Sequence, residues 1–225
     1  MAALTWDNVG ERYYETGTKR GVLFVQNTDG TYQTGVAWNG LTAVTESPSG
    51  AEATALYADD IKYLNLYSLE EFGATIEAYT YPEEFNQCDG SAELAPGVYV
   101  GQQTRKAFGL CYRTAVGNDT DGDAFGYKLH FIYNCKASPS EKSYATINDS
   151  PEAITFSWEV TTTPVDVTGY QPTASIIVDS TKFTTTNAKA ALAALEAYVY
   201  GTDGTPGTEP QMPSPAKIQE LLTYT

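Results

Sequence analysis

The chain has 225 residues, of which 42% are hydrophobic, a size that suits one large domain with a sizeable core. Its 13 Lys and Arg residues against 28 Asp and Glu residues give a formal net charge of −15, which repels nucleic-acid phosphate and argues against DNA binding. A conduit through which DNA slides remains compatible with this charge, because such a conduit avoids tight phosphate contacts.

Strands dominate the expected secondary structure, since the chain is rich in Tyr, Phe, Thr and Val. Residues 21–26 form an apolar run that ends at the turn sequence Asn27-Thr28-Asp29-Gly30, and residues 31–38 return, which predicts a hairpin. Further extended segments are expected at residues 41–46, 60–67 and 73–81.

Residues 47–59 show no clear period, and Ser47-Pro48-Ser49-Gly50 is a strong breaker at their start. A long irregular segment inside a compact β domain tends to be functional. We therefore predict that residues 41–67 form a projecting arm.

The clearest strands are expected at residues 106–116 and 127–135, on either side of a polar loop at 118–123. Apolar and polar side chains alternate in the second of them, which predicts that one face packs on the core and the other, with His130, is polar. Two more strands are expected at residues 154–160 and 174–179.

One helix is predicted at residues 187–199, where the sequence is rich in Ala and Leu and Gly201 follows as a C-terminal cap. Residues 202–225 begin with a Gly/Pro/Thr linker and are predicted to form a flexible C-terminal tail, with a final helical turn or two expected at residues 216–222. The chain is thus expected to be a single all-β domain over residues 1–201 with one helix.

The acidic loop is similar to the start of a calcium site, because Asp119, Asp121 and Asp123 occupy alternate positions. An EF-hand loop would need Gly and Glu where Ala124 and His130 stand, so a solvated turn with no metal is the preferred interpretation.

No enzyme is expected from this sequence. His130 is interpreted as a surface histidine without a nucleophile, and the adjacent carboxylates Glu70-Glu71, Glu83-Glu84 and Asp59-Asp60 would point to opposite faces of a strand. No nucleotide-binding motif or zinc-ligand cluster occurs, so no cofactor is predicted.

Cys88, Cys111 and Cys135 lack a C-x-x-C spacing and are expected to be free thiols. The absence of a signal peptide and of an 18-residue apolar run predicts a cytoplasmic protein without membrane contact.

Several segments resemble the major tail proteins of siphophages, the long-tailed, non-contractile bacteriophages. The resemblance is strongest at residues 57–66 (YADDIKYLNL) and 71–85 (EFGATIEAYTYPEEF), and it extends to residues 101–106 and 136–160. The similarity covers the chain from about its N-terminus to Tyr200 and leaves out the segment after Gly201.

The resemblance implies a tail-tube fold of two packed sheets with a flanking helix. It further implies a structural virion protein whose copies form rings, six copies in each, that stack into the tail tube and are assembled in the host cytoplasm. The implied partners are sister copies and other tail proteins, such as the tape measure, tail terminator and distal tail proteins. DNA would pass through the lumen on its way into the host without specific binding, and we expect a net acidic lumen for that reason.

On this interpretation the arm is the candidate for the contact between rings, and deletion of residues 47–52 should block polymerisation of a folded subunit. The candidate residues are Glu46, Ser47, Pro48, Ser49, Gly50 and Glu52, placed near its tip, together with Tyr57, Asp59 and Asp60.

The main alternative is a β-sandwich module that recognises a carbohydrate or a protein and does not assemble. A hydrolase with an unrecognised site is a more remote one. Electron microscopy of the purified protein separates the first two, since rings or tubes favour the tail protein and discrete monomers favour the module.

Overall fold

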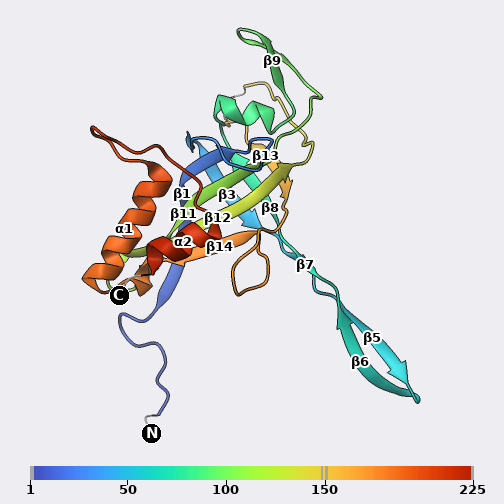
Figure 1. Ribbon diagram of the computed structural model, residues 1–225, viewed down its shortest axis with the longest axis vertical. Helices are drawn as coiled ribbons and strands as arrows, with labels where there is room; N and C mark the ends of the chain where they lie inside the picture. Colours follow the sequence, from blue (N-terminus) through green and yellow to red (C-terminus); the bar gives the residue numbers. More distant parts are fainter. Residues whose placement is uncertain (1–2, 148, 150–151, 224–225) are drawn as a thin grey trace.

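The protein is mostly β, as predicted, and its computed structural model describes residues 3–147, 149 and 152–223. The main sheet has eight antiparallel strands in the order β2-β1-β11-β12-β13-β8-β3, with β14 paired to β12 beside this path. Figure 1 shows this sheet at the centre of the molecule, with the helices on one side and a long hairpin projecting from the opposite side. The strand bounds are β1 Tyr13–Val25, β2 Val36–Trp38, β3 Leu41–Glu46, β8 Gly73–Ala78, β11 Phe108–Asn118, β12 Gly122–Ala137, β13 Phe156–Thr161 and β14 Ser175–Asp179.

Strand β12 carries the chain from one half of the sheet to the other. Its residues 128–132 pair with β14, whereas Lys136 and Ala137 pair with β13. Between these parts Asn134 has a φ of 47°, and the register with β11 shifts. An irregularity of this kind bends a strand and increases its twist, so the sheet folds over and its two halves face each other across a core.

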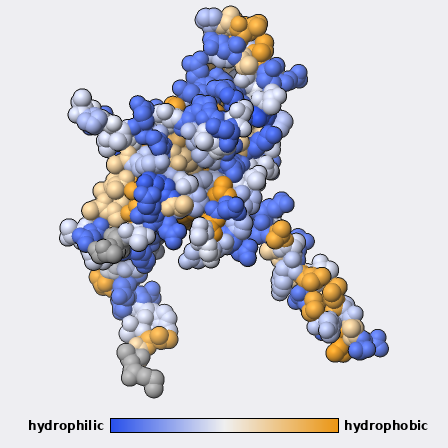
Figure 2. Space-filling view, viewed as in Figure 1, coloured by the Kyte–Doolittle hydropathy of each residue, from blue (hydrophilic) through white to orange (hydrophobic). Residues whose placement is uncertain are grey.

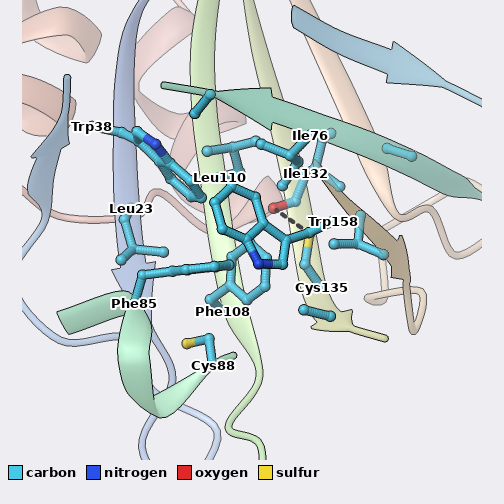
Figure 3. Close-up of a cluster of buried hydrophobic side chains, with 14 of the residues drawn as sticks. Leu23, Trp38, Ile76, Phe85, Cys88, Phe108, Leu110, Ile132, Cys135 and Trp158 are labelled. Atoms are coloured by element: carbon cyan, nitrogen blue, oxygen red, sulfur yellow. Dashed lines mark hydrogen bonds between the residues drawn. The ribbon is translucent and has the colours of Figure 1, made fainter. Parts of the chain in front are cut away.

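That core lies between the two halves and is rich in aromatic side chains (Figure 3). It contains Trp38, Phe85, Phe108, Leu110 and Trp158, all buried. It corresponds to the two packed layers that the family resemblance implies.

A second core covers the outer face of β1, β11, β12 and β14. Helices α1 (Thr186–Tyr200) and α2 (Pro215–Leu222) supply its other side through residues such as Leu195 and Ile218. Leu129 and Phe131 on β12 face these helices, while Ile132 belongs to the aromatic core. The expectation that one face of β12 is polar is therefore wrong, because this strand is covered on both sides.

Helix α1 confirms the predicted helix within one residue at each end. Thr185 caps it by accepting a hydrogen bond from the Ala188 N–H, and Gly201 follows with a φ of 75°. Within the described residues, no helix is long and apolar enough to cross a membrane.

The segment after Gly201 differs from the predicted flexible tail. Met212 and Ile218 are buried in the second core, and the Tyr133 hydroxyl donates to the Pro213 carbonyl oxygen at 3.0 Å. Gly35 N–H also donates to the Pro210 carbonyl oxygen at 2.9 Å. The segment packs because α2 presents apolar residues to α1 and β12.

A second, smaller hairpin follows β8. It consists of β9 (Ala92–Ala95) and β10 (Val98–Val100), after the 3-10 helix η1 (Glu83–Gln87). A further 3-10 turn, η2 (Ser180–Lys182), links β14 to the start of α1. The sequence pattern did not predict these elements.

Candidate assembly arm

The projecting arm is a two-stage hairpin between β3 and β8. At its root β4 (Ser49–Gly50) pairs with β7 (Glu70–Glu71), and further out β5 (Ala53–Ala58) pairs with β6 (Ile61–Tyr67). Figure 1 shows that it extends well away from the body. A projecting arm was predicted, but its bounds differ: β3 belongs to the main sheet, and the arm comprises residues 47–72.

The tip of the arm is a two-residue turn. Ala58 pairs with Ile61, and between them Asp59 and Asp60 have φ values of 52° and 60°. Positive φ at both central residues is the signature of the type I′ turn, whose twist matches that of the two strands and which Asp and Asn tolerate. Two of the predicted site residues, Asp59 and Asp60, are therefore the outermost residues of the arm, with Tyr57 close by.

The other predicted site residues lie at the root, so their placement near the tip is wrong. Glu46 ends β3, and the Ser47 N–H donates to the Gly73 carbonyl oxygen at 2.8 Å. Pro48, Ser49 and Gly50 follow at once, and the Glu52 N–H donates to Ser68 Oγ at 3.1 Å. The breaker sequence marks the point where the chain leaves the sheet.

Gly50 has a structural role at this root. Its φ is 82°, and an added Cβ would collide with the Leu69 carbonyl oxygen. Only glycine combines this conformation with so close an approach of two backbone segments.

One face of the outer hairpin is aliphatic. Leu56 lies directly opposite Leu64, and Thr54 lies opposite Leu66 on the same face by the period-two rule. Leu56, Leu64 and Leu66 are 41%, 39% and 54% exposed, and apolar side chains gather along the arm in Figure 2. Sequence reasoning had not assigned a role to these leucines, although Leu64 and Leu66 alternate around Asn65.

An arm of this kind lacks a core of its own. A two-stranded hairpin alone is at best marginally stable in water and needs a further strand or a packing surface. Contiguous exposed apolar side chains on a soluble protein mark an interaction site. The apolar face of the arm is thus left without a packing surface among the described residues.

The root of the arm is tied to the body by Glu46. The Tyr112 hydroxyl donates to Glu46 Oε1 at 2.6 Å, and His130 Nδ1 lies 3.5 Å from the same oxygen. The His130 ring stacks on Tyr112 with centroids 4.6 Å apart, and its Nε2 is 3.0 Å from Thr114 Oγ1. His130 is only 8% exposed, so its interpretation as a surface histidine is wrong. His130 is buried because the sheet folds over and brings Glu46, at the end of β3, against it.

These contacts lower the pKa of the Glu46 carboxyl group. The His130 imidazole is the main cause, the Tyr112 hydroxyl adds to it, and partial burial opposes both. Burial raises the pKa of Tyr112, so its hydroxyl remains a donor. Glu46 therefore holds the last residue of β3 against β11 and β12 as a charged acceptor.

We expect Glu46→Gln to flatten the dependence of stability on pH under acid conditions. A carboxyl group with a lowered pKa in the folded state stabilises the fold above its unfolded pKa, about 4.3 for Glu, and this contribution is lost as the pH falls through the folded value. The two proteins should thus differ most near neutral pH and converge below about pH 4. Urea unfolding at several pH values measures this. Glu159→Gln, at an exposed position of β13, is the matched control and should run parallel to the unaltered protein.

In the acidic loop at residues 118–123, side-chain oxygens accept hydrogen bonds from nearby backbone N–H groups. Asp119 Oδ1 accepts from the Gly10 N–H at 2.9 Å, and Asn118 Oδ1 accepts from the Asp121 N–H at 2.6 Å. In the described part of the chain, no group of three or more His, Cys, Asp or Glu residues is placed to hold a metal ion.

The three cysteines are free thiols, as predicted, and all are buried. Burial raises the pKa of the Cys88 thiol to about 12 and also raises those of Cys111 and Cys135. They pack as small apolar side chains rather than as reactive groups.

Comparisons with known proteins show similarity only at the level of distant structures. No family model and no curated protein matches the chain. A chain of the baseplate of the anti-feeding prophage, solved by cryo-EM, is 9% identical over 78% of this chain and 97% of that chain, with a TM-score of 0.37. A chain of the extended PVC sheath–tube complex, an extracellular contractile injection system, is 12% identical over 71% and 88%, with a TM-score of 0.31.

Proposed function

We propose that this protein is a structural tail protein whose copies assemble as stacked rings into the tube of a siphophage tail. The observation that carries the proposal is the arm, a hairpin of residues 47–72 with an exposed aliphatic face and no packing surface among the described residues. A second copy of the chain supplies the missing packing surface, because each subunit of a homo-oligomer contacts identical neighbours. The proposed ring has six copies, as the resemblance implies.

The charge of the chain suits this role. The proposed tube has a net acidic lumen, for which a chain of net charge −15 has ample carboxylates, so that DNA passes through during ejection without adhering. The proposed protein is structural rather than catalytic. Its partners are other copies of itself and further tail proteins, such as the tape measure, tail terminator and distal tail proteins, and it is assembled in the host cytoplasm into the virion tail.

A shortened arm tests the proposal. Because β4 and β7 pair at the root, residues 51–69 can be replaced by Asn-Gly, which closes Gly50 onto Glu70 with a short turn. We expect the unaltered protein to form tubes in negative-stain electron microscopy, whereas the shortened protein stays a folded monomer by size-exclusion chromatography and circular dichroism.

Two results would contradict the proposal. Long tubes formed by the shortened protein would exclude the arm as the ring-to-ring contact. An unaltered protein that remains monomeric at high concentration would instead favour the non-assembling binding module.

A further inference from the structure

A hollow of about 470 Å³ lies at the end of the main sheet where β1, β2 and the start of β3 meet. Its lining includes Lys19, Arg20, Trp38, Leu41 and Tyr200 and contains no carboxylate. Four other hollows of the described surface each include at least one Asp or Glu. The hollow is therefore locally basic, in contrast to the net charge of −15 of the whole chain.

Arg20 lies in an irregularity of the strand ladder directly after Lys19, which still pairs with Arg113 of β11. The register of β1 with β11 shifts between Lys19 and Val22, and Arg20 has a φ of 55°. Non-glycine residues rarely adopt positive φ, and such irregularities redirect side chains at functional surfaces. Both side chains are exposed, and neither pairs with a carboxylate within the described residues. The Arg20 guanidinium lies 5.7 Å from the centre of the Tyr200 ring.

The tip of the arm has the complementary chemistry. Asp59 and Asp60 are exposed and have no ion pair or side-chain hydrogen bond among the described residues. The apolar residues beside them, Tyr57 and Ile61, are 72% and 66% exposed. Two carboxylates flanked by apolar side chains match a hollow with two cations at its rim and Trp38 and Leu41 in its wall.

The arm and the hollow lie at opposite ends of β3. The hollow includes Leu41, where the strand begins, and the arm leaves after Glu46, where it ends. The arm has some 13 residues from its root to its tip, and an extended strand of that length spans about 40 Å. This is roughly the diameter of a domain of this size. A contact between different patches at opposite ends of a molecule is heterologous and can propagate without limit.

We propose that the arm tip of one copy docks into the Lys19–Arg20 hollow of a second copy, with Asp59 and Asp60 facing the two cations. This inference rests on the proposed function and names the receiving surface for the arm. Opposite charges at an interface set the register and exclude wrong partners, so the pair aligns successive copies along the tube.

Charge exchange tests this docking. Asp59→Asn with Asp60→Asn keeps a residue type that suits the positive-φ turn, and Lys19→Glu with Arg20→Glu reverses the hollow. Each pair should raise the critical concentration for tube formation at least about tenfold.

Asp59→Lys with Asp60→Lys, the reversed arm, should raise the critical concentration in the same way. Combining the reversed arm with the reversed hollow in one chain should restore tubes. An equimolar mixture of the reversed-arm and reversed-hollow proteins should also restore them, since each supplies the partner that the other needs.

Glu84→Lys with Glu141→Lys is the control for the Asp59→Lys, Asp60→Lys pair, because it changes the net charge by the same amount at exposed positions far from both surfaces in the sequence and should leave assembly unchanged. Loss of assembly in the arm variants but not in the hollow variants, or failure of both rescues, would overturn the docking site while leaving the role of the arm intact. An unaltered protein that forms no tubes would overturn the proposed function and this contact together. Circular dichroism and elution volume establish that each variant is folded.

Discussion

Replacing Leu56, Leu64 and Leu66 together with threonine should abolish tube formation while leaving the subunit folded. The three leucines share one face of the outer hairpin and belong to neither core cluster of the described residues. Burying each of them against a second copy contributes about 1 kcal/mol, because roughly half of its surface is still available. The triple variant would thus lose about 3 kcal/mol at each contact, which corresponds to roughly a hundredfold in association.

Threonine suits this test because its branched side chain favours strands, so that the hairpin keeps its conformation while its aliphatic surface is removed. The matched control is Tyr67→Thr, on the opposite face of the same hairpin and at its inner end, away from the docking tip. The tyrosine hydroxyl can stay hydrated, so this position is expected to remain in solvent and the control to form tubes. Sedimentation and negative-stain micrographs measure assembly. Tubes in the leucine variant, or their loss in the tyrosine variant alone, would show that the wrong face was chosen.

Much of the fold could be predicted because its signals are local. Strand β12 follows a period of two, and helix α1 follows from a run of Ala and Leu closed by Gly201. The coverage of β12 on both faces could not be predicted, because it depends on the bend at Asn134. His130 is buried for this reason, and nothing in the sequence distinguishes it from a surface histidine. The packing of Met212 and Ile218 depends likewise on a distant surface.

The arm was predicted only in part, for a physical reason. Strand β6 was expected as an extended segment at residues 60–67, whereas β5 lies in residues 47–59, which showed no clear period because this strand has no buried face. The proline and glycine of Pro48–Gly50 suggested a tip, but they serve the departure of the chain from the sheet. The two aspartates of the true turn carry a weaker signal, because Asp-Asp is less typical of a type I′ turn than Asn-Gly.

Replacing Trp158 with alanine should destabilise the subunit by about 3–5 kcal/mol, the range for deleting a large buried aromatic side chain. Trp158 lies on β13 at the centre of the aromatic core and is 0% exposed (Figure 3). Its ring meets Phe85 and Tyr81 edge to face, with centroids 5.0 and 5.3 Å away. Its loss leaves a cavity between the two halves of the sheet, which the strands on either side cannot close.

The indole also holds a buried charge in place. Its Nε1 donates to Asp89 Oδ1 at 3.1 Å, and the same carboxylate pairs with Lys142 and lies 4.0 Å from Arg105 Nη1. Trp158→Phe should therefore cost less than the alanine variant, about 1–3 kcal/mol, because it keeps most of the ring and leaves one buried hydrogen bond unmade. The two cations keep Asp89 partly satisfied in both variants.

Urea unfolding followed by circular dichroism measures both effects, in the background with the shortened arm so that assembly does not add to stability. Trp6→Ala is the matched control, because Trp6 is 76% exposed and its removal should change the free energy of unfolding by less than about 0.5 kcal/mol. A loss below about 1 kcal/mol for Trp158→Ala would mean that the two halves of the sheet can collapse onto the cavity. The aromatic core would then not be what holds the β3 and β8 layer, and with it the root of the arm, against the rest of the domain.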